Sequence, residues 1–133
     1  MTQFRQVTDR FSVSPQISPA DLAQAAAQGY TLVINNRPDG ESPDQPTSAE
    51  MEAAARAAGL DYLYAPVAGR PGPAQVGAVR DAVARSDGKV LAFCRSGTRS
   101  ILTWAMGQPP TADREELRRL GAAAGYDLSP VLG

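Results

Sequence analysis

The chain of 133 residues contains no histidine, and this absence removes several kinds of chemistry at once. Without imidazole, the sequence excludes a Ser-His-Asp triad, a histidine general base, and zinc or iron sites built on histidine. The chain has one cysteine, Cys94, which excludes an internal disulfide, a Cys-x-x-Cys redox pair and a metal site with several cysteines. We therefore expect no resident metal and no cofactor.

Long apolar runs are also absent. No stretch approaches the ~18 apolar residues that a membrane helix requires, and residues 1–15 lack the apolar core of a secretory signal. The 13 basic and 14 acidic side chains give a net charge of −1, which argues against a nucleic-acid surface or a polybasic membrane patch. We expect a cytoplasmic protein without a nucleic-acid or membrane partner, and the sequence leaves its oligomeric state open.

Length and composition favour one compact domain. Apolar residues make up 43% of the chain and charged residues 20%, which is ordinary for a soluble globular protein. A chain of this length buries roughly two-thirds of its unfolded surface, so it needs neither a disulfide nor a metal to fold. No segment has the composition of a linker, and residues 1–133 are therefore predicted to form a single domain.

Glycine, proline and capping residues divide the chain into alternating strands and helices. Apolar, β-rich runs predict four strands, at residues 11–14, 30–35, 60–65 and 89–93. Two capping boxes begin helices, at Ser18-Pro19-Ala20-Asp21 and at Thr47-Ser48-Ala49-Glu50. Three further helices are predicted, from Pro73 to a turn at 86–88, at 100–106 and at about 111–124. This alternation indicates an α/β fold with a mainly parallel sheet and right-handed crossovers.

The segment 94–99 lies between the most apolar strand and the most apolar helix. In open α/β sheets, ligands bind at the carboxyl ends of the strands. The backbone of this segment can curl until successive N–H groups point at one anion, because most of its residues are small. The start of the following helix and the guanidinium of Arg99 add positive charge. The residues that we expect to bind the anion here are Arg95, Ser96, Gly97, Thr98 and Ser100.

Such surroundings favour an ionised Cys94. The thiolate is the nucleophilic form of cysteine, and a helix N-terminus with nearby cations stabilises it without a histidine base. We infer that Cys94 is a nucleophile that works through a covalent intermediate. The competing interpretation is that Cys94 is a small core residue and Arg95 a surface arginine. The position of Cys94 between strand and helix, in step with Gly97 and Arg99, favours the chemical interpretation.

The run Cys-Arg-Ser-Gly-Thr-Arg-Ser resembles the active-site loop of single-domain rhodaneses, with Cys94, Gly97 and Arg99 at matching positions. Protein tyrosine phosphatases use a related Cys-x5-Arg loop, one residue longer than the Cys-x4-Arg found here. The chain from about residue 4 to 130 is similar to the bacterial beta-lactamase hydrolase-like phosphatase-like domains, which are also catalogued as a sulfur transferase family. The runs that carry this resemblance are 14–18, 34–41, 65–67 and 93–100.

The resemblance implies a three-layer α/β fold of the dual-specificity phosphatase type, with a mainly parallel central sheet flanked by helices and a rhodanese-like loop. The phosphatase type of fold and the rhodanese-like loop imply different reactions on a small anionic substrate. The first expectation is sulfur transfer, in which Cys94 takes sulfane sulfur as a persulfide while Arg99 and the loop amides stabilise its charge. The alternative is hydrolysis of a phosphoester through a phosphocysteine. A third hypothesis, an anion-binding or redox-sensing module without turnover, stays open.

A phosphatase of this type also needs an acid for the leaving oxygen. The loop 66–72 contains no carboxylate, and Phe93 stands where such phosphatases have a histidine. The remaining candidate catalytic acid is Asp39, with Glu41 and Asp44 behind it, although Asp39 fits equally well as a turn residue. Arg37 is expected either to bind the anion or to pair with Asp39.

Overall fold

Residues 3–132 are described by the computed structural model, and within them five strands form one sheet. The strand order is β1-β2-β5-β3-β4. The strands β2, β5, β3 and β4 pair in parallel, whereas the short β1 pairs antiparallel with β2. The bounds are β1 Arg5–Gln6, β2 Phe11–Ser14, β3 Tyr30–Asn35, β4 Asp61–Tyr64 and β5 Lys89–Phe93. The mainly parallel sheet predicted from the sequence is confirmed.

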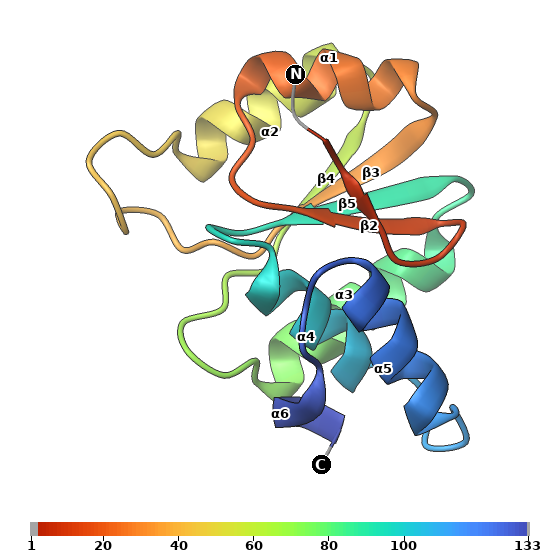
Figure 1. Cartoon of the computed structure of the whole chain (residues 1–133). Coiled ribbons are helices and arrows are strands. Elements are labelled where there is room, and N and C mark those ends of the chain that lie inside the picture. Colours follow the sequence, from red (N-terminus) through yellow and green to blue (C-terminus); the bar gives the residue numbers. More distant parts are fainter. Residues whose placement is uncertain (1–2, 133) are drawn as a thin grey trace.

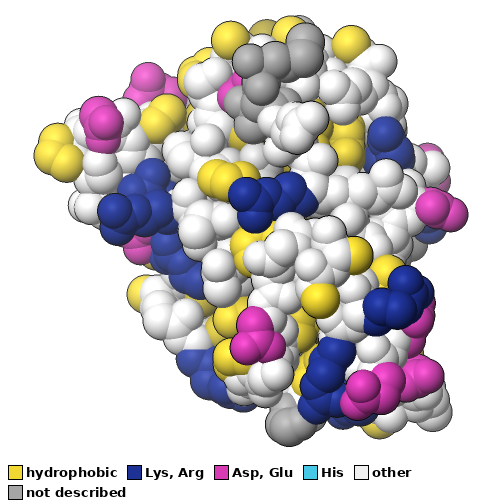
Figure 2. All heavy atoms as spheres, in the orientation of Figure 1, with side chains coloured by type: hydrophobic (Ala, Val, Ile, Leu, Met, Phe, Trp, Pro, Cys, Tyr) yellow, Lys and Arg dark blue, Asp and Glu magenta, His cyan; other side chains and the backbone are white. Residues whose placement is uncertain are grey.

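Helices cover both faces of this sheet, which gives three layers (Figure 1). One face carries α1 (Pro19–Ala27) and α2 (Ser48–Ala57). The other carries α3 (Pro73–Arg85), α4 (Thr98–Met106), α5 (Arg114–Ala123) and α6 (Ser129–Leu132). No helix in the described part of the chain is both long and apolar enough to cross a membrane. Charged side chains of both signs are interspersed over the face shown in Figure 2.

Alternate residues of the central strand β5 fill two separate cores. Val90 and Ala92 pack in the core that includes α3 and α4, whereas Leu91 and Phe93 pack in the core that includes α1 and α2. Successive side chains of a strand point to opposite faces, so a strand covered on both faces has to be apolar throughout. This requirement explains the continuous apolar run 90–93 that directly precedes Cys94.

The capping boxes begin α1 and α2 as predicted. In α2, for example, the Thr47 hydroxyl accepts a hydrogen bond from the Glu50 amide at 3.1 Å, and the Glu50 carboxylate accepts one from the Thr47 amide at 3.1 Å. The helix predicted at about 111–124 is α5, which begins at Arg114 because Asp113 caps it by accepting a hydrogen bond from the Glu115 amide at 3.0 Å. The sequence did not predict the two-residue β1 or the four-residue α6.

The carboxyl ends of the four parallel strands lie level with one another. Ser14 of β2 and Asn35 of β3 are both opposite Phe93 of β5, and Asn35 is also opposite Tyr64 of β4. The loops that follow these strands therefore start from one edge of the sheet. This edge is where open α/β sheets bind ligands.

Candidate active site

Backbone hydrogen bonds fasten the four loops together around Cys94. The Gln16 amide, after β2, donates to the carbonyl of Arg95 at 3.2 Å. The Asn36 amide, after β3, donates to the carbonyl of Phe93 at 2.8 Å. The loop after β4 joins through the Val67 amide, which donates to the carbonyl of Asn36 at 2.9 Å. The site is thus built on backbone that the sheet holds in place.

The sulfur of Cys94 is buried beneath these loops. The residue is 0% exposed, and the Gly97 amide donates to Cys94 Sγ at 3.1 Å. Gly97 is also the residue that caps the start of α4, with a φ of 91° that favours glycine. From outside, the Tyr126 hydroxyl donates to the carbonyl of Ser96 at 2.8 Å and holds the loop against the C-terminal segment. The backbone therefore presents an N–H donor and a helix start to the sulfur, as an anion site requires.

The guanidinium of Arg99 reaches across the site from α4. Its Nη1 and Nη2 donate to the two carboxylate oxygens of Glu41 at 2.7 and 2.9 Å, and Nη1 also donates to the carbonyl of Val67 at 2.7 Å. The carboxylate of Glu41 raises the pKa of Arg99; burial opposes this rise, and the neighbouring Cys94 sulfur adds to it. Arg99 therefore lies close to the sulfur and stays charged.

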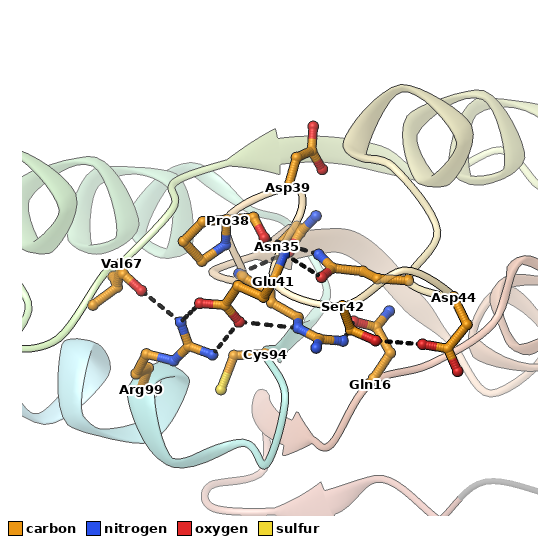
Figure 3. A network of polar contacts seen from close by, with 12 residues as sticks. Gln16, Asn35, Pro38, Asp39, Glu41, Ser42, Asp44, Val67, Cys94 and Arg99 are labelled. Carbon is orange, nitrogen blue, oxygen red and sulfur yellow. Dashed lines mark hydrogen bonds and ion pairs between the residues drawn. The ribbon is translucent and has the colours of Figure 1, made fainter.

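A second arginine enters the same network from the loop after β3. The side chain of Arg37 is 6% exposed; its Nε donates to Glu41 Oε1 at 3.1 Å and its Nη1 to Gln16 Oε1 at 3.1 Å. The Glu41 carboxylate thus bonds to this guanidinium and to that of Arg99, and Figure 3 shows it beside Arg99 and close to Cys94. Arg99 lowers the pKa of Glu41 to about 2; partial burial opposes this effect, and Arg37 adds to it. Of the two roles expected for Arg37, the pairing with Asp39 is wrong, because its carboxylate partner is Glu41, and anion binding stays a prediction.

Asp39 is not brought to the sulfur. Its Oδ1 accepts a hydrogen bond from the Ser48 amide at the start of α2 at 2.8 Å, and its own amide donates to the Tyr64 hydroxyl at 2.9 Å. In Figure 3 its carboxylate points away from Cys94. Asp44 lies farther along the loop and accepts a hydrogen bond from the serine two residues before it. The arrangement favours the structural role that the sequence left open for Asp39 over the role of an acid.

The other predicted anion-binding residues divide into two groups. Arg95, Ser96 and Thr98 are exposed, and the Ser96 hydroxyl donates to Thr98 Oγ1 at 3.0 Å. Gly97 and Ser100 are buried, and the Ser100 hydroxyl has no hydrogen-bond partner among the described residues. The buried members of the predicted set are therefore Gly97 and Ser100, both at the start of α4, while the other small residues of the run face solvent.

Glu41 has a larger part in the site than its place in the sequence predicts. It was noted only as lying behind Asp39, yet it contacts both arginines. The spacing Arg37-x3-Glu41, in a loop that follows a central strand, is the signal that could have identified Glu41 as a site residue. Tyr126 and Gln16 gave no such signal, because their contacts with the loop depend on the tertiary fold.

These features match a known family. The chain matches the family described as beta-lactamase hydrolase-like protein, phosphatase-like domain, over residues 3–111. The chain belongs to this family. Beta-lactamase hydrolase-like proteins of Xylella fastidiosa (strain Temecula1) and Agrobacterium fabrum (strain C58) are 38% and 34% identical to it over 125 residues. The match covers 92% of this chain but 29% of each of these relatives, so the chain spans less than a third of their length.

Solved structures confirm the phosphatase type of fold. A Neisseria meningitidis Z2491 protein described as a candidate phosphatase has a TM-score of 0.80 and 31% identity, over 96% of this chain and 92% of that one. Tk-PTP in its active form has a TM-score of 0.72 and 21% identity, over 97% and 90% of the two chains, and this likeness concerns the fold alone. The family and the fold support an enzyme of the phosphatase-like hydrolase class. The comparisons do not support sulfur transfer, our first expectation, and they favour its alternative.

Proposed function

We propose that this chain hydrolyses phosphomonoesters with Cys94 as the nucleophile. The observation that carries the proposal is the Gly97 amide, which points at the sulfur from 3.1 Å at the start of α4. In the first step the thiolate attacks phosphorus, a P–S bond forms, and the P–O bond to the leaving group breaks with its electron pair going to that oxygen. In the second step water attacks the phosphocysteine, the P–S bond breaks, and inorganic phosphate and the thiolate are released.

Arg99 would stabilise the charge that develops on the phosphoryl oxygens. A guanidinium fork suits two oxygens of one anion, and donors fixed in advance need no reorganisation as the charge develops. The carbonyl of Val67 holds one end of this fork at 2.7 Å, so its direction does not depend on a bound ligand. The buried Ser100 hydroxyl, which has no partner in the described chain, supplies a further donor in the same turn of α4.

The state of the carboxylates points to the kind of leaving group. Asp39 caps α2 and points away from Cys94, and the ion pairs of Glu41 hold the pKa of Glu41 at about 2, so this arrangement brings no proton-donating carboxyl group to the sulfur. Without an acid, the leaving oxygen departs as an anion, and only groups that stabilise this charge leave quickly. The proposed substrates are therefore aryl rather than alkyl phosphates.

The test is turnover of an aryl phosphate, combined with trapping of the intermediate. We expect Cys94→Ser to abolish turnover, and rapid acid quenching of the wild type to show a phosphate adduct on Cys94 by mass spectrometry. Arg99→Lys should lower kcat/KM by about 10²-fold, because the fork is lost while the charge is kept. The matched control is Arg56→Lys on the exposed surface of α2, where the arginine pairs with Glu52 and Asp61. Equal turnover by the wild type and Cys94→Ser would overturn the proposal.

Sulfur transfer, which the Cys-x4-Arg spacing suggested, is tested by adding thiosulfate and cyanide to the same proteins. A sulfur adduct on Cys94 with thiocyanate production, together with no turnover of aryl phosphate, would replace hydrolysis by sulfur transfer. An absence of both products would leave the third hypothesis, a binding module.

A further inference from the structure

The carboxylate of Glu41 bridges the two arginines that lie nearest to Cys94 in the polar network. It accepts two hydrogen bonds from Arg99, at 2.7 and 2.9 Å, and one from Arg37 at 3.1 Å (Figure 3). The two arginine side chains are 18% and 6% exposed, whereas the Glu41 side chain is 30% exposed and comes from the surface loop 36–47. The sulfur of Cys94 has no exposed surface. The two arginines are thus less exposed than Glu41, whose carboxylate reaches them from the surface loop.

On the basis of the proposed function, we propose that Glu41 is an internal competitor of the substrate. In the free protein its carboxylate occupies the site formed by Arg37 and Arg99. A dianionic tetrahedral group displaces it and takes over both arginines. Glu41 therefore sets which anions the site accepts and how tightly it binds them.

Charge and geometry both favour a dianion as the group that displaces Glu41. The two guanidiniums carry two positive charges, and Glu41 supplies one negative charge. A phosphomonoester dianion offers these guanidiniums two negative charges, whereas a phosphodiester or a carboxylate carries one charge and gains nothing over Glu41. A carboxylate also offers two oxygens, whereas a phosphoryl group offers three that can serve the Arg99 fork, Arg37 and the Gly97 amide together.

The loop allows Glu41 to leave without unfolding. Asp39 fixes one side of the loop through the Ser48 amide at 2.8 Å, and the Gln45 side chain donates to the carbonyl of Pro38 at 2.9 Å. These anchors do not involve the Glu41 carboxylate, so rotation of its side chain toward solvent is sufficient. Because the Glu41 carboxylate is partly exposed, water competes for its ion pairs, and a dianion with more charge can replace it.

The test measures binding of inorganic phosphate by titration calorimetry at constant ionic strength. The variant Glu41→Gln keeps the shape of the side chain and removes its charge, and we expect it to lower the phosphate Kd by about three- to tenfold. The KM for an aryl phosphate should fall by a similar factor, with a smaller change in kcat. The control is Glu52→Gln, which removes the same charge from an exposed pair with Arg56 on α2 and should leave the phosphate Kd within about twofold.

Weaker or unchanged phosphate binding in Glu41→Gln would overturn the proposal, because it would show that Glu41 holds Arg99 in place instead of competing with substrate. No detectable phosphate binding in either protein would overturn it as well. Repeating the titration in the Cys94→Ser background separates the two proposals, since phosphate binding requires no turnover. Tighter phosphate binding by Glu41→Gln without hydrolysis would support Glu41 as a competitor and reject the phosphatase proposal. Hydrolysis that depends on Cys94, without tighter binding, would support the phosphatase proposal and reject Glu41 as a competitor.

Discussion

The Tyr126 hydroxyl lies so close to Gly97 that a β-carbon at residue 97 would be 2.2 Å from it. The φ of 91° at Gly97 adds a second constraint, because L side chains rarely adopt it. The residue that points its amide at the sulfur is thus limited to glycine by its neighbour and by its own backbone.

Gly97→Ala should therefore reduce both activity and stability. We expect the free energy of unfolding to fall by about 1–3 kcal/mol, because alanine is strained at this φ. We expect kcat for an aryl phosphate to fall at least about tenfold, because the amide turns away from Cys94. Chemical denaturation and steady-state kinetics measure the two effects. The double variant Gly97→Ala/Tyr126→Phe, which removes the hydroxyl but not the strained φ, should recover part of the loss. A Gly97→Ala protein with wild-type kinetics would contradict the role of this amide.

The stability that Glu41 contributes should disappear in acid. Its pKa is about 2 in the folded protein, against an ordinary 4.5, so the group favours folding above pH 4.5 and loses this effect as the pH falls through 4.5 toward 2. Because the side chain is partly exposed, we expect the contribution to be about 1 kcal/mol. Denaturation of the wild type and Glu41→Gln across this range measures it. The free energies of unfolding should differ at pH 6 and converge near pH 2, and parallel curves would contradict the ion-pair network.

Asp39→Ala should act on stability and leave the chemistry nearly unchanged. The Asp39 carboxylate accepts a hydrogen bond from the first amide of α2, and loss of such a cap costs about 1 kcal/mol. A general acid would instead lose ~10²–10⁴-fold in kcat. Thermal unfolding and the pH profile of kcat for an aryl phosphate distinguish these outcomes. Loss of the alkaline limb of the profile in Asp39→Asn would restore Asp39 as the acid.

Rates should depend steeply on the leaving group. With Glu41 ionised near neutral pH and Asp39 bonded to α2, the oxygen departs without a proton, and rates should rise as the pKa of the released alcohol falls. A series of substituted phenyl phosphates, with an alkyl phosphate as the comparison, measures this slope. A flat series with chemistry as the slow step would indicate that a proton donor enters the site when substrate binds.

The order of strands and helices could be predicted because its signals are local. The capping box at Thr47 and the apolar run 90–93 each lie within a few residues of the element that they define. By contrast, β1 is a two-residue strand and carries no periodicity to detect. The cysteine loop could be predicted for the same reason as the helices, because its strand, its glycine and its arginine lie within a few residues of one another.

The charge network around the cysteine loop could not be predicted in the same way. Glu41 meets Arg99 across 58 positions of sequence, and this contact exists because β3 and β5 are neighbours in the sheet. Asp39 was preferred as an acid on its residue type, whereas its role depends on the approach of α2. Residue type was sufficient to name the candidates, and the strand order determined which carboxylate reached the arginines.

The level strand ends have a consequence for how such proteins can diversify. The loop 36–47 leaves the sheet at Asn35 and rejoins the fold at Ser48, while the segment that carries Cys94 hangs from a different strand. We therefore expect insertions between residues 40 and 46 to change which ligand binds without moving the Cys94 sulfur relative to the Gly97 amide. For protein engineering, this stretch is a loop that can be exchanged while the sheet and the cysteine loop are kept unchanged.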